Sequence, residues 1–313
     1  MISVVLPTHN RADVLRRSID SVLCQTYPDI ELIVVDDGST DKTHEVIAGV
    51  DDRRLREIIF EQRRGAPAAR NEGIRASAGE FIAFQDSDDE WLAKKLVLQV
   101  EIFERLPERY GVVYTGFRIV GRSGQIRTYP SLLTRLASKL PYKKTRLQGN
   151  IQKSLRRGNF ITTQSALVRR ECFDQVGMFD ESLPRFQDWD LWLRMSHYYS
   201  FAYIQKPLIK VYSMPINISG NKDALVIAFE LLLIKHLNGS SEDKDLLGQY
   251  YFALGDLACL EKEEEKGREY FREAIRLSPA NLAYRFAWFA SRFGPEIYRR
   301  VAGISGFSYP IMM

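Results

Sequence analysis

Three short apolar runs near the beginning of the chain each end abruptly in polar side chains. Residues 2–6, 30–35 and 81–84 are almost continuously apolar, which is typical of strands buried on both faces of a sheet. Stretches with a helical spacing of apolar residues separate these runs. Alternating strands and helices predict a mainly parallel sheet with helices on both faces, which is a Rossmann-like α/β fold.

The polar residues that follow the three runs predict a shared site. They are Thr8, Asn10, Asp36, Asp37, Asp86, Asp88 and Asp89. The carboxyl ends of parallel strands lie at one edge of a sheet, and open α/β sheets bind their ligands there. Three unrelated polar turns are the alternative interpretation.

The stretch EFIAFQDSDDEW, residues 80–91, carries the most distinctive chemistry. Asp86, Asp88 and Asp89 place three carboxylates within four residues, and these repel one another unless water or a cation intervenes. An acidic turn in which Asp88 or Asp89 caps a following helix would also explain the pattern. Asn10 is likewise predicted to cap the helix that follows it, and Gly79 to end the helix over residues 65–78.

Two phosphate-binding motifs are missing from the sequence. No G-x-G-x-x-G follows the first apolar run, and no G-x-x-x-x-G-K-[ST] occurs anywhere in the chain. Their absence argues against a dinucleotide-dependent dehydrogenase and against a P-loop kinase or ATPase. A divalent cation held by carboxylates is then the expected means of binding phosphates.

The composition is that of an ordinary globular protein. The 313 residues are 45% hydrophobic and 27% charged, and the net charge of +4 gives no reason to expect nucleic acid. Cys24, Cys172 and Cys259 lack metal-ligand spacing, so we expect reduced core thiols of a cytosolic protein. The sequence shows no signal-peptide pattern and no long apolar stretch, so we expect a cytoplasmic protein without a transmembrane helix.

Two ordered stretches resemble a known family. The runs VVLPTHNRADVLRRSIDSVLCQTYPDIELIVVDDGSTDKT and ARNEGIRASAGEFIAFQDSDDEW closely resemble family 2 glycosyltransferases of the GT-A fold, over roughly residues 1–220. The resemblance implies a hexosyltransferase that is inverting and uses a nucleotide-diphosphate sugar, expected to be a UDP-sugar, with Mn²⁺ or Mg²⁺. The implied acceptor is a hydroxyl of a saccharide or lipid-linked saccharide in cell-surface polysaccharide or glycan synthesis.

The resemblance also implies roles for individual residues. Residues implied to bind the nucleotide sugar are Thr8, Asn10, Asp37, Arg70 and Asp86. Asp88 would ligate the metal that bridges the diphosphate, and Asp188 in QDWDLW would be the general base. A surface helix arginine is the alternative interpretation of Arg70, and helix capping alone would explain either Asp188 or Asp190.

The chain departs from the family pattern at two places. Gln187 stands where a glutamate is usual, a change that should leave the base in place. Tyr212 and Met214 stand in a stretch where many relatives carry an arginine and a histidine, so the resemblance leaves the third metal ligand open.

Residues 118–157 contain basic side chains but no acidic ones. Leucines and a tyrosine lie between the basic residues, so we expect a surface that meets anionic lipid headgroups or a pyrophosphate-linked acceptor. The protein would then be peripheral on the inner face of the cell membrane. A solvated basic loop is the alternative interpretation.

The character of the sequence becomes helical after residue 220. We therefore predict a glycosyltransferase domain over residues 1–220 and a helical appendage over 221–313. The spacing of small and apolar residues over 251–279 resembles one tetratricopeptide-type repeat, which would bind a protein partner or form a homo-oligomer. A plain helical hairpin is the alternative, and the acidic run over 261–265 is interpreted as a solvated helix face.

Two rival functions from other classes fit parts of the sequence. A phosphotransferase could use Asp86 as a nucleophile, although its motif would be expected after the first strand. A non-catalytic scaffold could bind a nucleotide sugar and use the helical region as its working surface.

Overall fold

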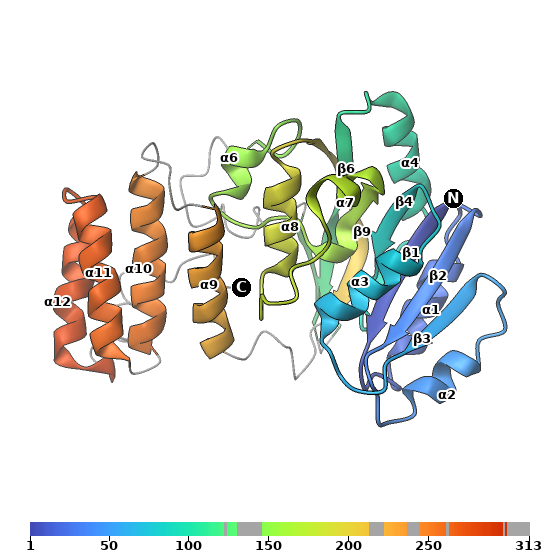
Figure 1. The fold of residues 1–313 in the computed structure, drawn as a ribbon, viewed down its shortest axis with the longest axis horizontal. Helices are drawn as coiled ribbons and strands as arrows, with labels where there is room; N and C mark the ends of the chain where they lie inside the picture. The colour runs from blue at the N-terminus through green and yellow to red at the C-terminus, as the bar shows by residue number, and fades with distance from the viewer. Residues whose placement is uncertain are drawn as a thin grey trace. The chain divides into compact units, whose positions relative to one another are not determined.

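The computed structural model describes residues 1–121, 124–129, 146–212, 222–236, 244–260, 263–296 and 298 (Figure 1). The chain forms two compact units: Met1–Ser182 together with Gln187–Pro215, and Leu183–Phe186 together with Ile216–Met313. The domain boundary predicted at 220/221 falls outside the described residues. So do Met214 and residues 122–123 and 130–145 of the basic stretch, whereas Lys153, Arg156 and Arg157 are described.

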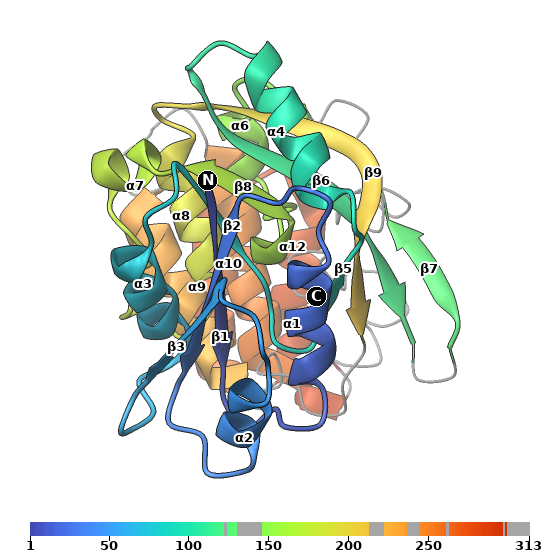
Figure 2. The ribbon, with the colours of Figure 1, turned by 90° about the vertical axis from the view of Figure 1, so that its right-hand side faces the viewer.

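The first unit is built on one mixed sheet (Figure 2). Its strands are β1 (Ile2–Thr8), β2 (Ile30–Asp36), β3 (Leu55–Ile59), β4 (Phe81–Phe84), β5 (Glu90–Trp91), β6 (Tyr110–Val120), β7 (Ile126–Tyr129), β8 (Ala166–Arg169) and β9 (Ser200–Tyr212). Their order is β3-β2-β1-β4-β8-β6-β9-β5, and β7 pairs with β6. β3, β2, β1 and β4 are mutually parallel, β8 runs against its neighbours, and β6 and β9 are parallel. The predicted, mainly parallel α/β sheet is therefore confirmed.

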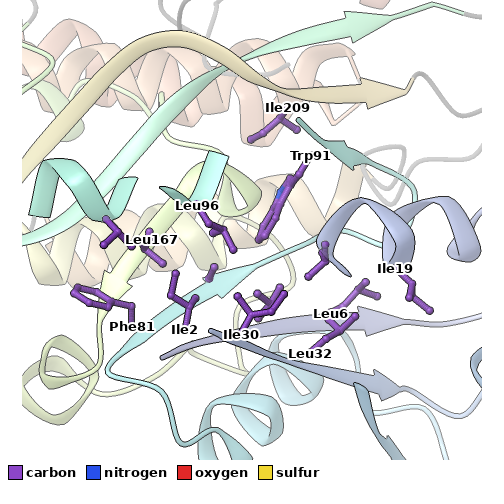
Figure 3. Close-up of a cluster of buried hydrophobic side chains, with 14 of the residues drawn as sticks. Ile2, Leu6, Ile19, Ile30, Leu32, Phe81, Trp91, Leu96, Leu167 and Ile209 are labelled. Atoms are coloured by element: carbon purple, nitrogen blue, oxygen red, sulfur yellow. The ribbon is translucent and has the colours of Figure 1, made fainter. Parts of the chain in front are cut away.

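Helices cover both faces of this sheet. They are α1 (Leu15–Leu23), α2 (Thr43–Ala48), α3 (Ala66–Ala76), α4 (Lys95–Arg105), α6 (Gln152–Leu155), α7 (Glu171–Val176) and α8 (Gln187–Met195). Alternate residues of β2 enter different cores, because successive side chains of a strand point to opposite faces. Leu32 packs in the cluster that contains Ile19 and Leu96 (Figure 3), whereas Ile33 packs with Ala69 of α3.

Small residues allow α3 to lie close to the sheet. Gly73 faces Val5 of β1 so closely that a Cβ at Gly73 would overlap the valine side chain. Arg64 and Gly65, directly before α3, donate hydrogen bonds to Asp37, which follows β2, so the beginning of α3 lies at the carboxyl edge of the sheet.

Two predicted helix caps are wrong. α1 begins at Leu15 rather than after Asn10, whose side chain instead accepts a hydrogen bond from Thr40 N at 2.8 Å. α3 ends at Ala76 and is followed by Ser77 in an extended conformation, so Gly79 caps nothing. The alternative interpretation, in which Asp88 or Asp89 caps a following helix, does not hold either, because both residues precede the short strand β5, which pairs with β9.

The expectation of three core thiols is wrong for one cysteine. Cys172 and Cys259 are buried, but Cys24 is exposed directly after α1. All three thiols are free.

Lys95 of α4 is a fully buried lysine. Its Nζ donates to Gln99 Oε1 at 2.9 Å and lies 3.8 Å from the centre of the Trp91 ring. Gln99 in turn donates to the carbonyl groups of Val113 and Ser165. Burial lowers the pKa of Lys95 well below its ordinary value, because desolvation disfavours the ammonium form.

Lys95 predicts a pH dependence of stability. Between the lowered pKa of Lys95 in the folded chain and the ordinary 10.5, the unfolded chain binds more protons at this side chain, so stability rises with pH. Its contribution has a limiting slope of about 1.4 kcal/mol per pH unit. Urea unfolding from neutral to alkaline pH should show a flatter profile in Lys95→Met, but not in Lys94→Met on the exposed neighbour. Parallel profiles for Lys95→Met and the parent would contradict this account.

The second unit is helical. It contains α9 (Lys222–His236), α10 (Lys244–Leu260), α11 (Glu264–Leu277), α12 (Leu282–Ala290) and the 3₁₀ turn η4 (Ser291–Phe293). α10 and α11 approach closely at Gly255 and Gly267, because a Cβ at Gly255 would lie 2.5 Å from the Phe271 ring and 3.0 Å from Gly267 O. The tetratricopeptide-like nature of this pair stays a prediction. Among the described residues, none of the helices combines the length and the apolar character needed to cross a bilayer.

The burial of Phe271 leads us to expect that the stability of the α10–α11 pair depends strongly on its packing. Its side chain is fully buried and lies 5.4 Å from the Phe252 ring, centroid to centroid. Phe271→Asp should lower the free energy of unfolding by about 4 kcal/mol, since it removes an aromatic and buries an unpaired charge. The matched change is Glu263→Gln with Glu264→Gln at the start of α11, which should leave urea unfolding nearly unchanged. A small effect of Phe271→Asp would show that the helix pair tolerates loss of its core.

Candidate functional site

Three parallel strands end side by side and form the edge that carries the candidate site. Thr8 lies opposite Asp36, and Val5 lies opposite Phe84, so the residues after β4 run past the end of β1. Backbone hydrogen bonds continue beyond the strands, from Asp37 N to Thr8 O at 2.8 Å and from Gln85 N to Val5 O at 3.0 Å. The edge formed by Thr8, Asp36, Asp37 and the Asp86–Asp89 turn is called the donor edge below, after the sugar donor that the sequence leads us to expect there.

Asp37 links the end of β2 to the segment that leads into α3. Its carboxylate accepts hydrogen bonds from Arg64 N at 2.6 Å and Gly65 N at 2.8 Å. Gly38 follows with φ +68°, and a Cβ there would lie 2.8 Å from Arg63 N, so the close approach requires glycine. Asp37 therefore shapes the donor edge as well as lying on it.

Thr8 and Asn10 have different surroundings at this edge. The Thr8 side chain is buried, and its hydroxyl oxygen has no hydrogen-bond partner among the described residues. Asn10 is exposed with φ +50°, and its backbone N–H donates to Ser39 Oγ at 2.9 Å. Asn10 thus fastens the loop after β1 to the loop after β2.

The three carboxylates of the Asp86–Asp89 turn have three separate environments. Asp86 pairs with Arg70 Nη2 at 3.0 Å. Asp89 is buried and accepts hydrogen bonds from Gln164 Nε2 at 2.7 Å and from Tyr212 N at 3.1 Å. Within the described part of the chain, no basic side chain lies within ion-pair distance of the Asp88 carboxylate.

Burial and mutual repulsion raise the pKa of two of these carboxyl groups. For Asp88 the larger cause is desolvation and the next is the charge of Asp86. For Asp89 desolvation again comes first, followed by Asp86 and Asp88, and its pKa lies well above the ordinary range. The turn thus concentrates negative charge that a bound cation would offset.

Residues of α1 hold the backbone of this turn. Arg17 Nη2 donates to Asp88 O at 2.6 Å, and the Arg17 guanidinium lies 3.7 Å from the centre of the Tyr212 ring. Ser18 Oγ lies within hydrogen-bond distance of the carbonyl oxygens of Asp86 and Asp89. Sequence reasoning missed both residues. A serine on the apolar face of a helix was the available signal for Ser18.

Asp188 lies in the first turn of α8. Its carboxylate accepts a hydrogen bond from Trp189 N at 2.8 Å and lies 3.3 Å from Thr163 Oγ1. Desolvation raises the pKa of Asp188, the nearby Arg70 opposes the shift, and Asp86 adds to it. Arg70 thus acts on Asp86 and on Asp188, which places both carboxylates in one electrostatic neighbourhood.

Asp190, two residues after Asp188 in the same helix, is unsuited to proton transfer with a ligand. It is fully buried and forms an ion pair with Arg194 Nη2 at 2.9 Å. Arg194 also donates to backbone carbonyls of residues 176–178, so the pair fastens α8 to the segment that follows α7.

The described residues of this edge can hold a divalent cation only if a bound substrate supplies further ligands. Among the described residues, no three aspartate, glutamate, histidine or cysteine side chains form a cluster able to hold a metal. Among the three carboxylates of the Asp86–Asp89 turn, that of Asp88 is the one with no basic side chain and no hydrogen-bond donor of another described residue as its partner. One carboxylate together with substrate phosphates is a common mode of Mg²⁺ binding, so the residues fit a donor-bridged cation rather than a protein cage.

Comparisons with known proteins assign the chain to a class. The model of glycosyl transferase family 2 matches residues 3–177. The chain therefore belongs to glycosyl transferase family 2. An uncharacterized glycosyltransferase of Rickettsia typhi is 30% identical over 210 residues, which are 67% of this chain and 63% of that protein.

A second relative carries a more specific name. The UDP-Glc:alpha-D-GlcNAc-diphosphoundecaprenol beta-1,3-glucosyltransferase WfgD of Escherichia coli is 36% identical over 123 residues, which are 39% of this chain and 48% of that protein. The chain thus spans less than two thirds of the length of either relative.

Solved structures share the fold. Staphylococcus aureus TarS 1–349 in complex with UDP-GlcNAc matches with a TM-score of 0.66 and 16% identity, over 97% of this chain and 92% of that one. The mannosyltransferase PcManGT of Pyrobaculum calidifontis, in complex with GDP-Man and Mn²⁺, matches with a TM-score of 0.56 and 18% identity, over 97% and 86%. These likenesses confirm the GT-A fold predicted from the sequence.

Proposed function

We propose that this chain is an inverting glycosyltransferase that moves a sugar from a nucleotide-diphosphate sugar to an acceptor hydroxyl. The observation that carries the proposal is that Asp86 pairs with Arg70, while the charge of Asp86 acts on both Asp88 and Asp188. Transfer of this kind needs a carboxylate to accept a proton and a charged environment for the departing diphosphate.

The donor is proposed to be a UDP-sugar and the acceptor a saccharide or lipid-linked saccharide. WfgD, whose name gives a UDP-Glc donor and a diphosphoundecaprenol acceptor, supports both choices through its similarity. TarS, whose title gives UDP-GlcNAc, supports the nucleotide. PcManGT was solved with GDP-Man, so the fold alone does not determine whether the nucleotide carries uracil or guanine.

Thr8 and Asp37 are proposed to hold the base and ribose of the nucleotide, with Asp86 by the ribose. Asn10 and Arg70 are proposed as further residues of the same nucleotide-sugar site. Thr8 offers a buried hydroxyl without a partner among the described residues. Asp37 and Asn10 are already held by backbone hydrogen bonds, so their positions are set before a ligand arrives. Such preorganisation lowers the entropy that binding must overcome.

Asp188 is proposed to act as the general base. It would take the proton of the acceptor hydroxyl while that oxygen attacks the anomeric carbon and the bond to the diphosphate breaks. The raised pKa of Asp188 brings its basicity closer to that needed at neutral pH. No covalent intermediate with the protein is required, and a Mn²⁺ or Mg²⁺ ion held through Asp88 would offset charge on the diphosphate.

The Asp88 proposal predicts metal-dependent donor binding. Asp88→Ala should weaken binding of UDP in the presence of Mn²⁺ by at least about tenfold, since the cation loses its protein ligand. Isothermal titration with and without chelator would measure this, with Asp51→Ala, a change of an exposed aspartate, as control. Full UDP affinity in chelator would refute a metal-bridged donor.

The Asp188 proposal predicts a loss of turnover without a loss of donor affinity. Asp188→Asn keeps the side-chain shape and an acceptor for Trp189 N but removes the basicity. Transfer should fall by about 100-fold or more, while UDP affinity changes little.

The dependence of kcat/KM on pH is a second test of the role of Asp188. Asp188 must be ionised to accept a proton, so kcat/KM should decrease as the pH is lowered through the pKa of Asp188. Because that pKa is raised, the midpoint of the decrease should lie above the ordinary aspartate pKa of 3.8. Near-normal turnover of Asp188→Asn would mean that another group is the base. Turnover lost together with UDP affinity would point to a structural role.

A further inference from the structure

A cavity of about 750 Å³ opens on the first unit away from the donor edge. The end of α4, the loop to β6, residues 146–150 and the beginning of β9 enclose it. We call it the arginine cleft, because Arg105, Arg109 and Arg146 line it from three separate segments.

The strand registers place the arginine cleft at the opposite edge of the sheet. Val112 and Ile82 both pair with Val168, so they stand at the same level along the strands. Tyr110, which lines the cleft, is two residues before that level, and Asp86 is four residues beyond it. Six residues at ~3.3 Å each separate the two edges by roughly 20 Å along the strands. In Figure 2, α4 lies near the top and α2 near the bottom of the view.

The three arginines carry positive charge that the described chain does not neutralise. None of the described carboxylates lies within 4.0 Å of their guanidinium nitrogens, although α4 itself contains Glu101 and Glu104. Like charges gathered in a concavity focus a positive potential and attract anions. The planar guanidinium group donates two parallel hydrogen bonds to a phosphate or a carboxylate.

The remaining lining indicates that the ligand is more than a small ion. The volume lies within the range of small-molecule sites, and an inorganic phosphate would leave most of it empty. Tyr110 and Tyr203 add aromatic surface, and Tyr203 is steadied by stacking on Tyr114 at 4.9 Å between ring centres. Gln148 and Asn150 supply amides that both donate and accept hydrogen bonds, as sugar hydroxyls require.

We propose that the arginine cleft binds an anionic saccharide, through its phosphate or carboxylate group, at a site separate from the donor edge. The arginines would hold the anionic group, and the tyrosines and amides would hold the ring. A further role as a tether for a growing acceptor chain rests on the proposed glycosyltransferase function, but the binding itself does not.

Calorimetric titration of the full chain with three matched sugars tests the proposal. Glucose 6-phosphate and glucuronate distinguish a phosphate from a carboxylate ligand, and glucose is the neutral control, all at low ionic strength with chelator present. At least one anionic sugar should bind at least about tenfold more tightly than glucose and lose affinity as salt is added. Equal binding of all three sugars would overturn the proposal.

Variants then locate the binding. The double change Arg105→Gln with Arg146→Gln should weaken the anionic sugar by at least about tenfold, because two charge-assisted contacts are lost. Arg53→Gln, a change of an exposed arginine near β3, is the matched control and should have no effect. Unchanged affinity in the double variant would overturn the assignment, as would loss of affinity in Asp88→Ala. Asp188→Asn should leave the affinity for the anionic sugar intact. Turnover therefore tests the glycosyltransferase proposal, whereas anionic-sugar affinity tests the arginine cleft, and either proposal can fail without the other.

Discussion

Repulsion among the carboxylates of the turn after β4 is the constraint on which the candidate site depends. The fold meets it by giving each group its own surroundings: Arg70 pairs with Asp86, and Gln164 with a backbone N–H holds Asp89 in the interior. Arg17 and Ser18 fix the carbonyl groups of the same turn from α1. Of the three carboxylates in this turn, only that of Asp88 has neither a basic side chain nor a hydrogen-bond donor of another described residue as its partner, so it is the one best able to meet a cation.

Arg70 couples two carboxyl groups of the donor edge, because its positive charge acts on both Asp86 and Asp188. It neutralises Asp86 and at the same time opposes the rise in the pKa of Asp188. A change at Arg70 would therefore alter two carboxyl groups on different elements, and its effects would not add to those of single changes at either one. The close seat of α3 against Val5 keeps Arg70 in register with both.

Local patterns were enough to predict the strands and the common edge, because continuous apolar runs and the polar residues behind them lie within a few positions. The partners of Asp89 were not predictable in this way, since Gln164 and Tyr212 are 75 and 123 residues away in the chain. Asn10 misled for a related reason. An asparagine before a helical pattern is a common cap, but here the loop after β2 offers its side chain a different partner.

Among the three cysteines, Cys24 alone offers an exposed thiol, and it lies in the first unit. Cys172 and Cys259 are buried, and desolvation raises the pKa of each thiol to about 12, so few thiolates form at neutral pH. Cys24 is exposed at the end of α1, six residues after Ser18 and thus about 9 Å along the helix axis from the residue that holds the acidic turn. A thiol-reactive fluorophore would therefore attach selectively to the native chain, at the end of the helix whose Arg17 and Ser18 hold the Asp86–Asp89 turn.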